Sequence, residues 1–427
     1  MNIKNKNIVL VSLFVLFILL IISCDHKKET LLINIIPVAS SVGNYSILNL
    51  SEYASEIRYK TLETNESVLV GAIRQIIYEN EKILTLDYSN NCFLFDNNGT
   101  FLRKIGQFGQ GPDDYISIGQ VWIHENYIYQ IDARKILIYD INGYLVEKNY
   151  LLSNEIPREY SRVGMGGIIP LKKDTFIMNV VSAIGYYPKA ILFDVYQSNI
   201  KLIKEYPSYV KLDKLPPGSM SSDELGIMYR YLDEVRTYKV INDTVFTIDQ
   251  NTEMKDGFIF ELGKYRTTLS FIEGKVGSDN SFDYSKNFIT PKNIFESHNH
   301  LFIEFDFGNH APEPFELRSP ISNNPYTYNR VYGVFDKYTG KIILMKQPIK
   351  RKLGFKNDVD NGPVIWPHYI SSNNELVTYI LPEEFMDYYE KTENPTPQMT
   401  EIAKNLKFDD NPIVIITKIK EKGLGKK

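Results

Sequence analysis

The sequence predicts an all-β fold, a six-bladed β-propeller, from three observations: a repeated strand motif, many aromatic residues, and two terminal segments suited to pairing. The chain of 427 residues contains 30 Tyr and 23 Phe, and these residue types favour half-buried strands. It has only two cysteines, Cys24 and Cys92. The fold therefore depends on burial of apolar side chains, for which a chain of this length is sufficient.

The repeated motif occurs in two segments that begin ILTLD and IYQID. Asp87 aligns with Asp132 (132 − 87 = 45), and Asp96 aligns with Asp140 (140 − 96 = 44). Each segment consists of a strand, a short turn, a strand that ends in Asp, an Asn-Gly pair and another strand. The Asn-Gly pairs predict type I′ hairpin turns. A period near 44 residues with three or four strands is typical of a propeller blade.

Weaker copies of the motif begin at Ala190, Asp243, Arg330 and Asn411, which brings the number of predicted blades to six. A closed ring needs a partner for its last free strand edge. The segments EIRYKTLE near the N-terminus and PIVIITKIK near the C-terminus are therefore expected to share the last blade.

A small helical insertion is expected near the C-terminus. The segment LPEEFMDYYEKTENPTPQMTEIAKNL has apolar residues at helical spacing and is interrupted at Pro395 and Pro397, so it predicts two short helices between strands of the last blade. The predicted domain boundaries are 1–23 for a signal peptide, 24–44 for a tether, 45–420 for the propeller and 421–427 for a basic tail.

The N-terminus has the pattern of an export signal. Two lysines precede an apolar run from Ile8 to Ile22, which is short for a membrane span. The run ends in IISC, which resembles the lipobox of bacterial lipoproteins and implies a lipid on Cys24. We therefore expect a lipid-anchored protein of the cell envelope, at the outer membrane. An ordinary signal peptide with an incidental cysteine and an uncleaved anchor are the alternatives.

The glycine-rich segment KIGQFGQGPDDY raises the question of a phosphate-binding loop. Its glycines, Gly106, Gly109 and Gly111, lack the spacing of a dinucleotide fingerprint or a P-loop. Pro112 and two acidic residues follow, and the carboxylates would repel a phosphate. The segment is expected to be the crossover between two blades, with Tyr115 packed over it.

With these segments in view, the chain resembles the six-bladed β-propeller lipoproteins of Bacteroidetes-type bacteria, which are related in architecture to NHL and TolB-like propellers. The resemblance rests on SEIRYKTLET, FDNNGTFL, KIGQFGQGPDDY, GFKNDVDNGPVIWP and DDNPIVIITKIK. Asn361 stands where this family usually has the first of two glycines. The resemblance implies the fold and the lipid anchor, but it implies no reaction, because most of the family has none assigned.

Motifs for chemistry are few. The stretch NDVDNGP resembles the start of a calcium loop, but its closing glutamate is missing, so a structural turn is favoured. His298 and His300, with His310 nearby, do not complete a metal-ligand spacing. Nucleophile-elbow and zinc-protease motifs are absent from the sequence. The net charge of −4 argues against a nucleic-acid partner. No metal or cofactor is predicted.

The favoured function is a non-catalytic binding or scaffold propeller for a glycan, a peptide or an envelope protein. The alternative is a carbohydrate-active enzyme, a lyase or hydrolase, with its site at the mouth of the propeller. Besides the membrane contact through lipidated Cys24, such a ligand is the only partner expected.

A candidate ligand pocket is expected where two long connections, 207–235 and 306–330, meet on one face, because long loops in a compact domain are usually functional or disordered. The candidate residues combine aromatic and charged side chains: Tyr229, Arg230, Tyr231, His310, Arg318, Tyr326 and Arg330.

Overall fold

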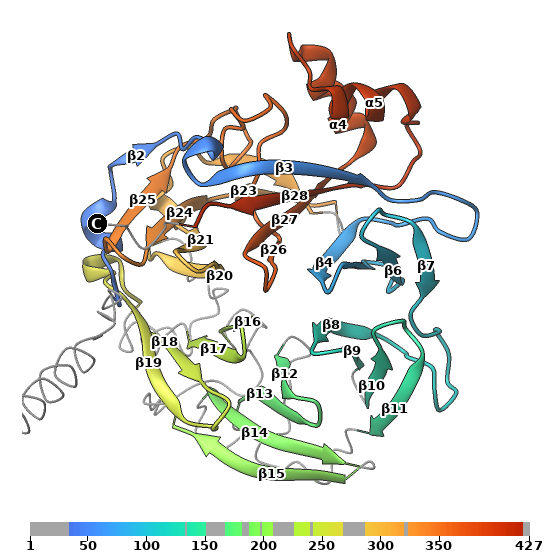
Figure 1. The fold of residues 1–427 in the computed structure, drawn as a ribbon. Coiled ribbons are helices and arrows are strands. Elements are labelled where there is room, and N and C mark those ends of the chain that lie inside the picture. Colours follow the sequence, from blue (N-terminus) through green and yellow to red (C-terminus); the bar gives the residue numbers. More distant parts are fainter. Residues whose placement is uncertain are drawn as a thin grey trace, which may run out of the picture. The chain divides into compact units, whose positions relative to one another are not determined.

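Six β-sheets surround a common centre (Figure 1), which confirms the six-bladed β-propeller that the sequence predicts. This computed structural model describes residues 34–132, 135–150, 167–181, 188–196, 199–207, 226–239, 242–267, 287–319 and 323–421. All of them belong to one compact unit that begins at Asn34. No helix in these ranges is both long and apolar enough to cross a membrane.

Blades 1 to 3 are four-stranded antiparallel sheets. Blade 1 contains β4 (Ile73–Glu79), β5 (Lys82–Asp87), β6 (Cys92–Asp96) and β7 (Phe101–Lys104). Blade 2 contains β8 (Ile118–His124), β9 (Tyr127–Asp132), β10 (Lys135–Asp140) and β11 (Leu145–Tyr150). Blade 3 contains β12 (Ile168–Lys172), β13 (Thr175–Val181), β14 (Pro188–Tyr196) and β15 (Asn199–Tyr206).

Blades 4 to 6 add strands from the N-terminal segment. Blade 4 contains β16 (Ile227–Tyr231), β17 (Glu234–Lys239), β18 (Asn242–Ile248), β19 (Met254–Phe260) and β1 (Ile35–Ile36). Blade 5 contains β20 (Thr290–Glu296), β21 (His300–Asp306), β24 (Arg330–Asp336), β25 (Lys341–Met345) and β2 (Tyr45–Ser46). Blade 6 contains β26 (Tyr369–Ile370), β27 (Glu375–Ile380), β28 (Ile413–Ile419) and β3 (Ala54–Thr61). A separate hairpin, β22 (Phe315–Arg318) with β23 (Pro325–Tyr328), lies between β21 and β24.

The burial of each strand depends on its place in the blade. In β5 the five residues from Ile83 to Asp87 are all buried, because neighbouring blades cover both faces of a middle strand. In the outer strand β7 half-buried and exposed residues alternate, because one of its faces meets solvent. The first strands of adjacent blades, such as β4 and β8, contact each other around the centre.

The repeated Asp residues close the outer hairpins of the blades. The carboxylate of Asp96 accepts hydrogen bonds from the backbone N–H groups of Asn98 (2.8 Å) and Thr100 (2.9 Å). Asp140 makes the equivalent contacts in blade 2. Only the glycine of each Asn-Gly pair has a positive φ, as at Gly99. The predicted type I′ turns are therefore wrong, because the Asp side chain holds the preceding residues in an ordinary turn and only glycine adopts the left-handed conformation.

The glycine-rich segment lies between β7 and β8 and is the crossover from blade 1 to blade 2, as the sequence predicts. Tyr115 is buried there, and its hydroxyl donates to the carbonyl oxygen of Asn90 (2.8 Å). The backbone N–H of Gly111 donates to Asp114 (2.8 Å). The Asp114 carboxylate thus accepts a backbone N–H of the loop, a donor that a phosphate-binding loop would offer to its phosphate.

Residues before position 45 also pack against the blades. β1 pairs in parallel with β19, and β2 pairs in parallel with β25. The short helix α2 (Val38–Ser41) lies between them, with Val38 fully buried. The segment assigned to the tether therefore includes β1, which covers the outer edge of blade 4, and β2 directly after it covers the outer edge of blade 5. An uncovered edge strand would be open to pairing with other chains.

The closure of the ring and the helical insertion are as the sequence predicts. β3 pairs with β28 in blade 6, so the N-terminal and C-terminal parts of the propeller share one sheet. Helices α4 (Pro382–Lys391) and α5 (Pro397–Asn405) lie between β27 and β28. Each begins with a proline in its first turn, where the missing N–H costs nothing.

Candidate functional site

The candidate site is a pocket of about 350 Å³ at the end of the propeller where the innermost strands finish. The turns after β4, β8, β16 and β20 line it, together with β26 and the turn that follows. We call it the central pocket. Its volume is within the usual range for small-ligand sites.

Tight turns bring polar side chains to this pocket. After β4, both Asn80 and Glu81 have positive φ angles, near 50° and 57°, as a two-residue turn requires. Glu125 after β8 and Leu232 after β16 have similar angles. As a result, the strands end abruptly, and their last residues lie at the pocket wall.

Glu79 is the last residue of β4 and contributes a half-buried carboxylate. It accepts hydrogen bonds from the hydroxyl of Tyr369 (2.9 Å) and from the backbone N–H (2.7 Å) and hydroxyl (2.5 Å) of Ser372. Burial raises the pKa of Glu79 above its usual range, although these hydrogen bonds act in the opposite direction. Glu79 thereby ties blade 1 to blade 6.

Among the residues that the structure describes, Arg230 is the only Lys or Arg side chain that lines the central pocket. Its guanidinium donates to the carbonyl oxygens of Pro170 and Leu232, the latter at 2.9 Å. His124 lies on the same side, with Nε2 at 3.2 Å from the carbonyl oxygen of Leu171. Burial and the nearby Arg230 charge lower the pKa of His124 to about 4. His124 is therefore neutral near pH 7, and Arg230 is the positive charge of this wall.

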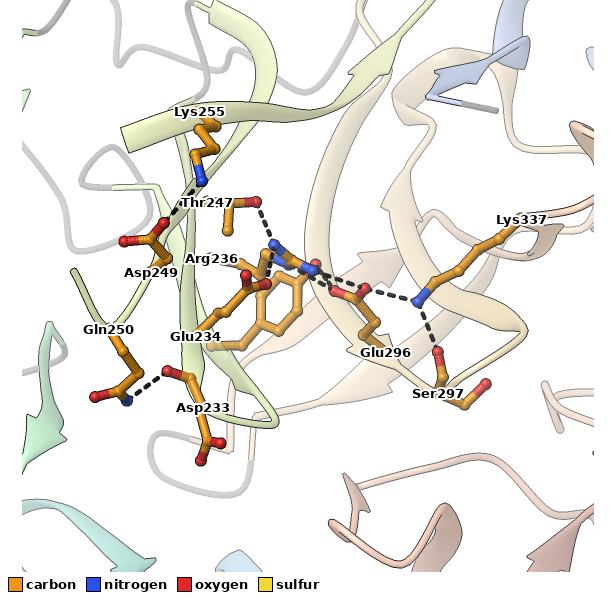
Figure 2. A network of polar contacts seen from close by, with 11 residues as sticks. Asp233, Glu234, Arg236, Thr247, Asp249, Gln250, Lys255, Glu296, Ser297 and Lys337 are labelled. Carbon is orange, nitrogen blue, oxygen red and sulfur yellow. Dashed lines mark hydrogen bonds and ion pairs between the residues drawn. The ribbon is translucent and has the colours of Figure 1, made fainter. Parts of the chain in front are cut away.

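In the neighbouring blade 5, Glu296 lies at the centre of a buried charge network (Figure 2), and its side chain is 0% exposed. Lys337 donates to one carboxylate oxygen of Glu296 at 2.7 Å, and Arg236 Nε donates to the other at 3.1 Å. The hydroxyl of Tyr229 also donates to Glu296 (2.9 Å). The Lys337 and Arg236 charges outweigh burial and hold the pKa of Glu296 below its usual range.

Tyr231 connects this network to the pocket. Lys337 Nζ lies 4.3 Å from the centroid of the Tyr231 ring, and the guanidinium carbon of Arg236 lies 5.1 Å from it. Both distances are in the range of cation–π attraction. Because Tyr231 also lines the central pocket, the buried cations fix an aromatic ring in its wall.

The structure distributes the seven sequence-predicted pocket residues over different places. Arg230 and Tyr231 line the central pocket, and Tyr229 lies behind it, against Glu296. Of the other four, His310, Arg318 and Tyr326 belong to the segment between β21 and β24, and Arg330 is the first residue of β24. β21 begins at the central pocket and leads away from it, so this segment is at the far end of blade 5.

In that segment Arg318 lines a second hollow of about 870 Å³ beside the hairpin β22–β23. Tyr326 is exposed on the same hairpin. His310 packs edge-on against Tyr265, with ring centroids 4.9 Å apart, and Arg330 begins β24. The seven residues therefore do not line one pocket. Residues 208–225 of the first predicted loop lie outside the described ranges.

Sequence reasoning missed Glu79, His124 and Tyr369. A signal for two of them was present, because Glu79 and His124 are separated by the repeat offset (124 − 79 = 45) and both end the first strand of a blade. If the repeat had been extended toward the N-terminus to include these strands, Glu79 and His124 would have been predicted at the same end of the propeller. The position of Tyr369 depends on a two-residue strand that has no such pattern.

The carboxylates that resembled a calcium loop have other partners. Asp358 accepts hydrogen bonds from the N–H (2.8 Å) and hydroxyl (2.6 Å) of Ser51, and Asp360 accepts one from Tyr59. In the described ranges, no three His, Cys, Asp or Glu side chains are grouped so as to hold a metal ion. Cys24, the predicted lipid anchor, lies outside the described ranges.

Comparison with known proteins gives a family match and several similar solved structures. The family described as "Domain of unknown function (DUF4934)" matches residues 33–418. A solved structure from Bacteroides fragilis NCTC 9343, assigned as an exported protein, is 18% identical with a TM-score of 0.63, and the match covers 88% of this chain and 98% of that one. A member of the duf4221 family from Bacteroides vulgatus ATCC 8482 is 12% identical with a TM-score of 0.48, covering 86% and 97%. At 18% identity the Bacteroides fragilis structure shows similarity of fold alone, and no curated protein matches the chain.

Proposed function

The chain belongs to the DUF4934 family, and we propose that it is an envelope-anchored binding propeller that takes a small polar ligand in the central pocket. The observation that carries this proposal is the convergence of strand ends. The last residues of four innermost strands, Glu79, His124, Tyr231 and Glu296, all line one pocket. Concave sites with a few convergent polar groups are where proteins bind small molecules.

Binding fits the pocket better than the alternative of a lyase or hydrolase. Glycoside cleavage commonly uses two carboxyl groups that act on one bond. Here Glu79 accepts three hydrogen bonds from blade 6, and Glu296 is held by Lys337 and Arg236. Both carboxylates are thus engaged in holding blades together.

The envelope location rests on the sequence. The apolar run that ends in IISC and the charged residues directly after Cys24 support lipid attachment at that cysteine. The segment between Cys24 and β1 is about ten residues long, and it would reach at most about 35 Å if fully extended. The propeller would then stay close to the membrane surface.

The proposal is tested by filling the pocket. Asp233 is exposed and lines the central pocket, so Asp233→Trp should block it. Asp256→Trp places the same change at an exposed position of β19 in the same blade and serves as the control. The full-length protein in detergent is screened by thermal shift against mono- and disaccharides and dipeptides.

At least one compound should raise the melting temperature of the wild type and of Asp256→Trp, and it should lose this effect in Asp233→Trp. If every compound that binds does so equally well to Asp233→Trp, the central pocket is not the binding site.

A further inference from the structure

The charges of the central pocket are arranged unevenly, with a positive charge in the wall and negative charges at the rim. Arg230 carries the positive charge, and carbonyl oxygens of Pro170 and Leu232 accept two of its five N–H donors. Within the described ranges no carboxylate oxygen lies within 4.0 Å of its guanidinium. The charges of Asp233 and Glu79 act on Arg230 from beyond ion-pair distance. A half-buried guanidinium without a direct ion pair attracts a carboxylate that can approach it closely.

The other charged groups of the wall have partners of their own. Glu296 is neutralised by Lys337 and Arg236, and Arg236 also pairs with Glu234 at 2.8 Å. Glu79 accepts its hydrogen bonds from blade 6. Among the charged groups of the described wall, Arg230 therefore has a charge without a direct ion pair, and its guanidinium is available to a ligand carboxylate.

The rim has the opposite sign. Glu125, in the turn after β8, has a side chain that is 53% exposed, and Asp233, in the turn after β16, is exposed as well. Among the described residues, the basic group within ion-pair distance of Glu125 is His124, whose Nε2 lies 3.9 Å away and which is neutral near pH 7. A ligand with several negative charges would be repelled at this rim, whereas an ammonium group would be attracted.

We propose that the ligand is a small zwitterion, a short peptide with free ends or a single amino acid. Its carboxylate binds Arg230, and its ammonium group lies toward Glu125 and Asp233. This inference rests on the proposed function, since it names the chemical class that the central pocket takes. A volume of about 350 Å³ accommodates a molecule of dipeptide size.

The test uses three dipeptide pools of the same composition: unmodified, N-acetylated and C-amidated. Binding to the full-length protein in detergent is followed by thermal shift, and the best sequence is then measured by calorimetry in its three forms. The unmodified form should bind most tightly. Amidation should weaken binding about tenfold or more, because it removes the charge-assisted hydrogen bonds to Arg230. Acetylation should weaken it only a few-fold, since the rim charges are exposed.

Variants assign each effect to its residue. Arg230→Gln should make the acid and amide forms bind equally, and Arg230→Lys should keep part of the preference. Asp233→Asn should reduce the difference between the free and acetylated forms. Each comparison is made within one variant, so a change in its stability does not affect the conclusion.

The inference is overturned if the amide binds as tightly as the acid, or if the preference for the acid survives in Arg230→Gln. It is also overturned if only neutral sugars bind and their binding is lost in Asp233→Trp, a result that leaves the proposed function intact. If no compound is sensitive to Asp233→Trp, the proposed function and this inference fail together.

Discussion

Tyr59 of β3 donates a hydrogen bond of 2.8 Å to the carboxylate of Asp360, and both side chains are buried. The other carboxylate oxygen of Asp360 accepts the backbone N–H of Gly362 at 2.9 Å. This contact joins the strand that closes the ring to the NDVDNGP turn, about 300 residues later in the chain. The motif that resembles a calcium loop therefore stabilises the closure of the propeller.

Removing the Tyr59 hydroxyl should weaken this closure. Tyr59→Phe leaves a buried carboxylate with one hydrogen bond fewer, which should lower the free energy of unfolding by about 1–3 kcal/mol. Tyr326→Phe removes a hydroxyl from an exposed ring on the hairpin β22–β23 and should change stability by less than about 0.5 kcal/mol. Urea unfolding of both variants measures the difference, and equal effects would contradict the role of the contact.

The ion pair between Lys337 and Glu296 should be costly to break from one side. Lys337→Met leaves Glu296 buried with Arg236 as its remaining charged partner, and we expect a loss of about 3 kcal/mol in the free energy of unfolding. Lys341→Met, at an exposed position of the following strand, should cost little.

A double variant separates the lost pair from the lost side chain. Lys337→Met with Glu296→Gln removes the uncompensated charge, so it should be more stable than the sum of the two single changes predicts. If the effects simply add in urea unfolding, Lys337 does not stabilise the protein through Glu296.

The sequence predicts the blades well because each blade repeats local signals. Asp96 and Asp140 recur with their glycines after buried strands, and the hydrogen bonds of their carboxylates explain why the pattern repeats. The closure could be predicted because an unpaired edge is costly, and β3 is indeed the partner of β28.

The central pocket could not be predicted in the same way. Arg230 and Tyr369 meet there because the innermost strands of different blades end around one axis. Their proximity depends on the angle by which each blade is rotated from the previous one around the axis. No short sequence pattern encodes this angle. The parallel pairing of Ile35–Ile36 with β19 was missed for a related reason, since a two-residue strand has too few residues to show a period.

Gly106 in the blade crossover should not accept a side chain. Its φ is +69°, and a Cβ atom would lie 2.7 Å from both Gln130 Oε1 and the Tyr139 hydroxyl. Gly106→Ala should therefore lower the free energy of unfolding by about 3 kcal/mol, because it strains the backbone and displaces these buried groups. Gly43→Ala is the matched control, because Gly43 also has a positive φ but no atom within 4 Å of the added Cβ. It should cost only about 1 kcal/mol. Similar losses for both variants would show that packing at Gly106 is not tight.

Lipid attachment at Cys24 has a direct test. Cys24→Ala should abolish incorporation of a labelled fatty acid and should release the protein from the membrane fraction, because the apolar segment before it is short for a span. Cys92→Ala is the control, since Cys92 is buried in blade 1 and should not be modified. Labelling that persists in Cys24→Ala would overturn the proposed anchor.

His124 should make the protein less stable in mild acid. Its side chain is 8% exposed, and burial together with Arg230 lowers its pKa from 6.5 to about 4. Above pH 6.5 His124 is neutral in both the folded and unfolded states, so it contributes no pH dependence there. Between pH 6.5 and 4 the unfolded chain binds a proton that the folded protein does not, and stability therefore falls as the pH falls, by about 3 kcal/mol in total from this residue.

His124→Gln removes this titration and keeps an N–H donor for the carbonyl oxygen of Leu171. The free energy of unfolding is measured with urea at pH 7 and at pH 4. Its decrease between these two pH values should be about 3 kcal/mol smaller in the variant than in the wild type. Ile123→Val, a neutral change at the neighbouring residue of the pocket, should keep the wild-type pH dependence. If His124→Gln also keeps it, His124 is protonated in the folded protein over this range. His124 and Arg230 would then be two adjacent positive charges in the pocket wall. That result would contradict the assignment of Arg230 as the positive charge of this wall.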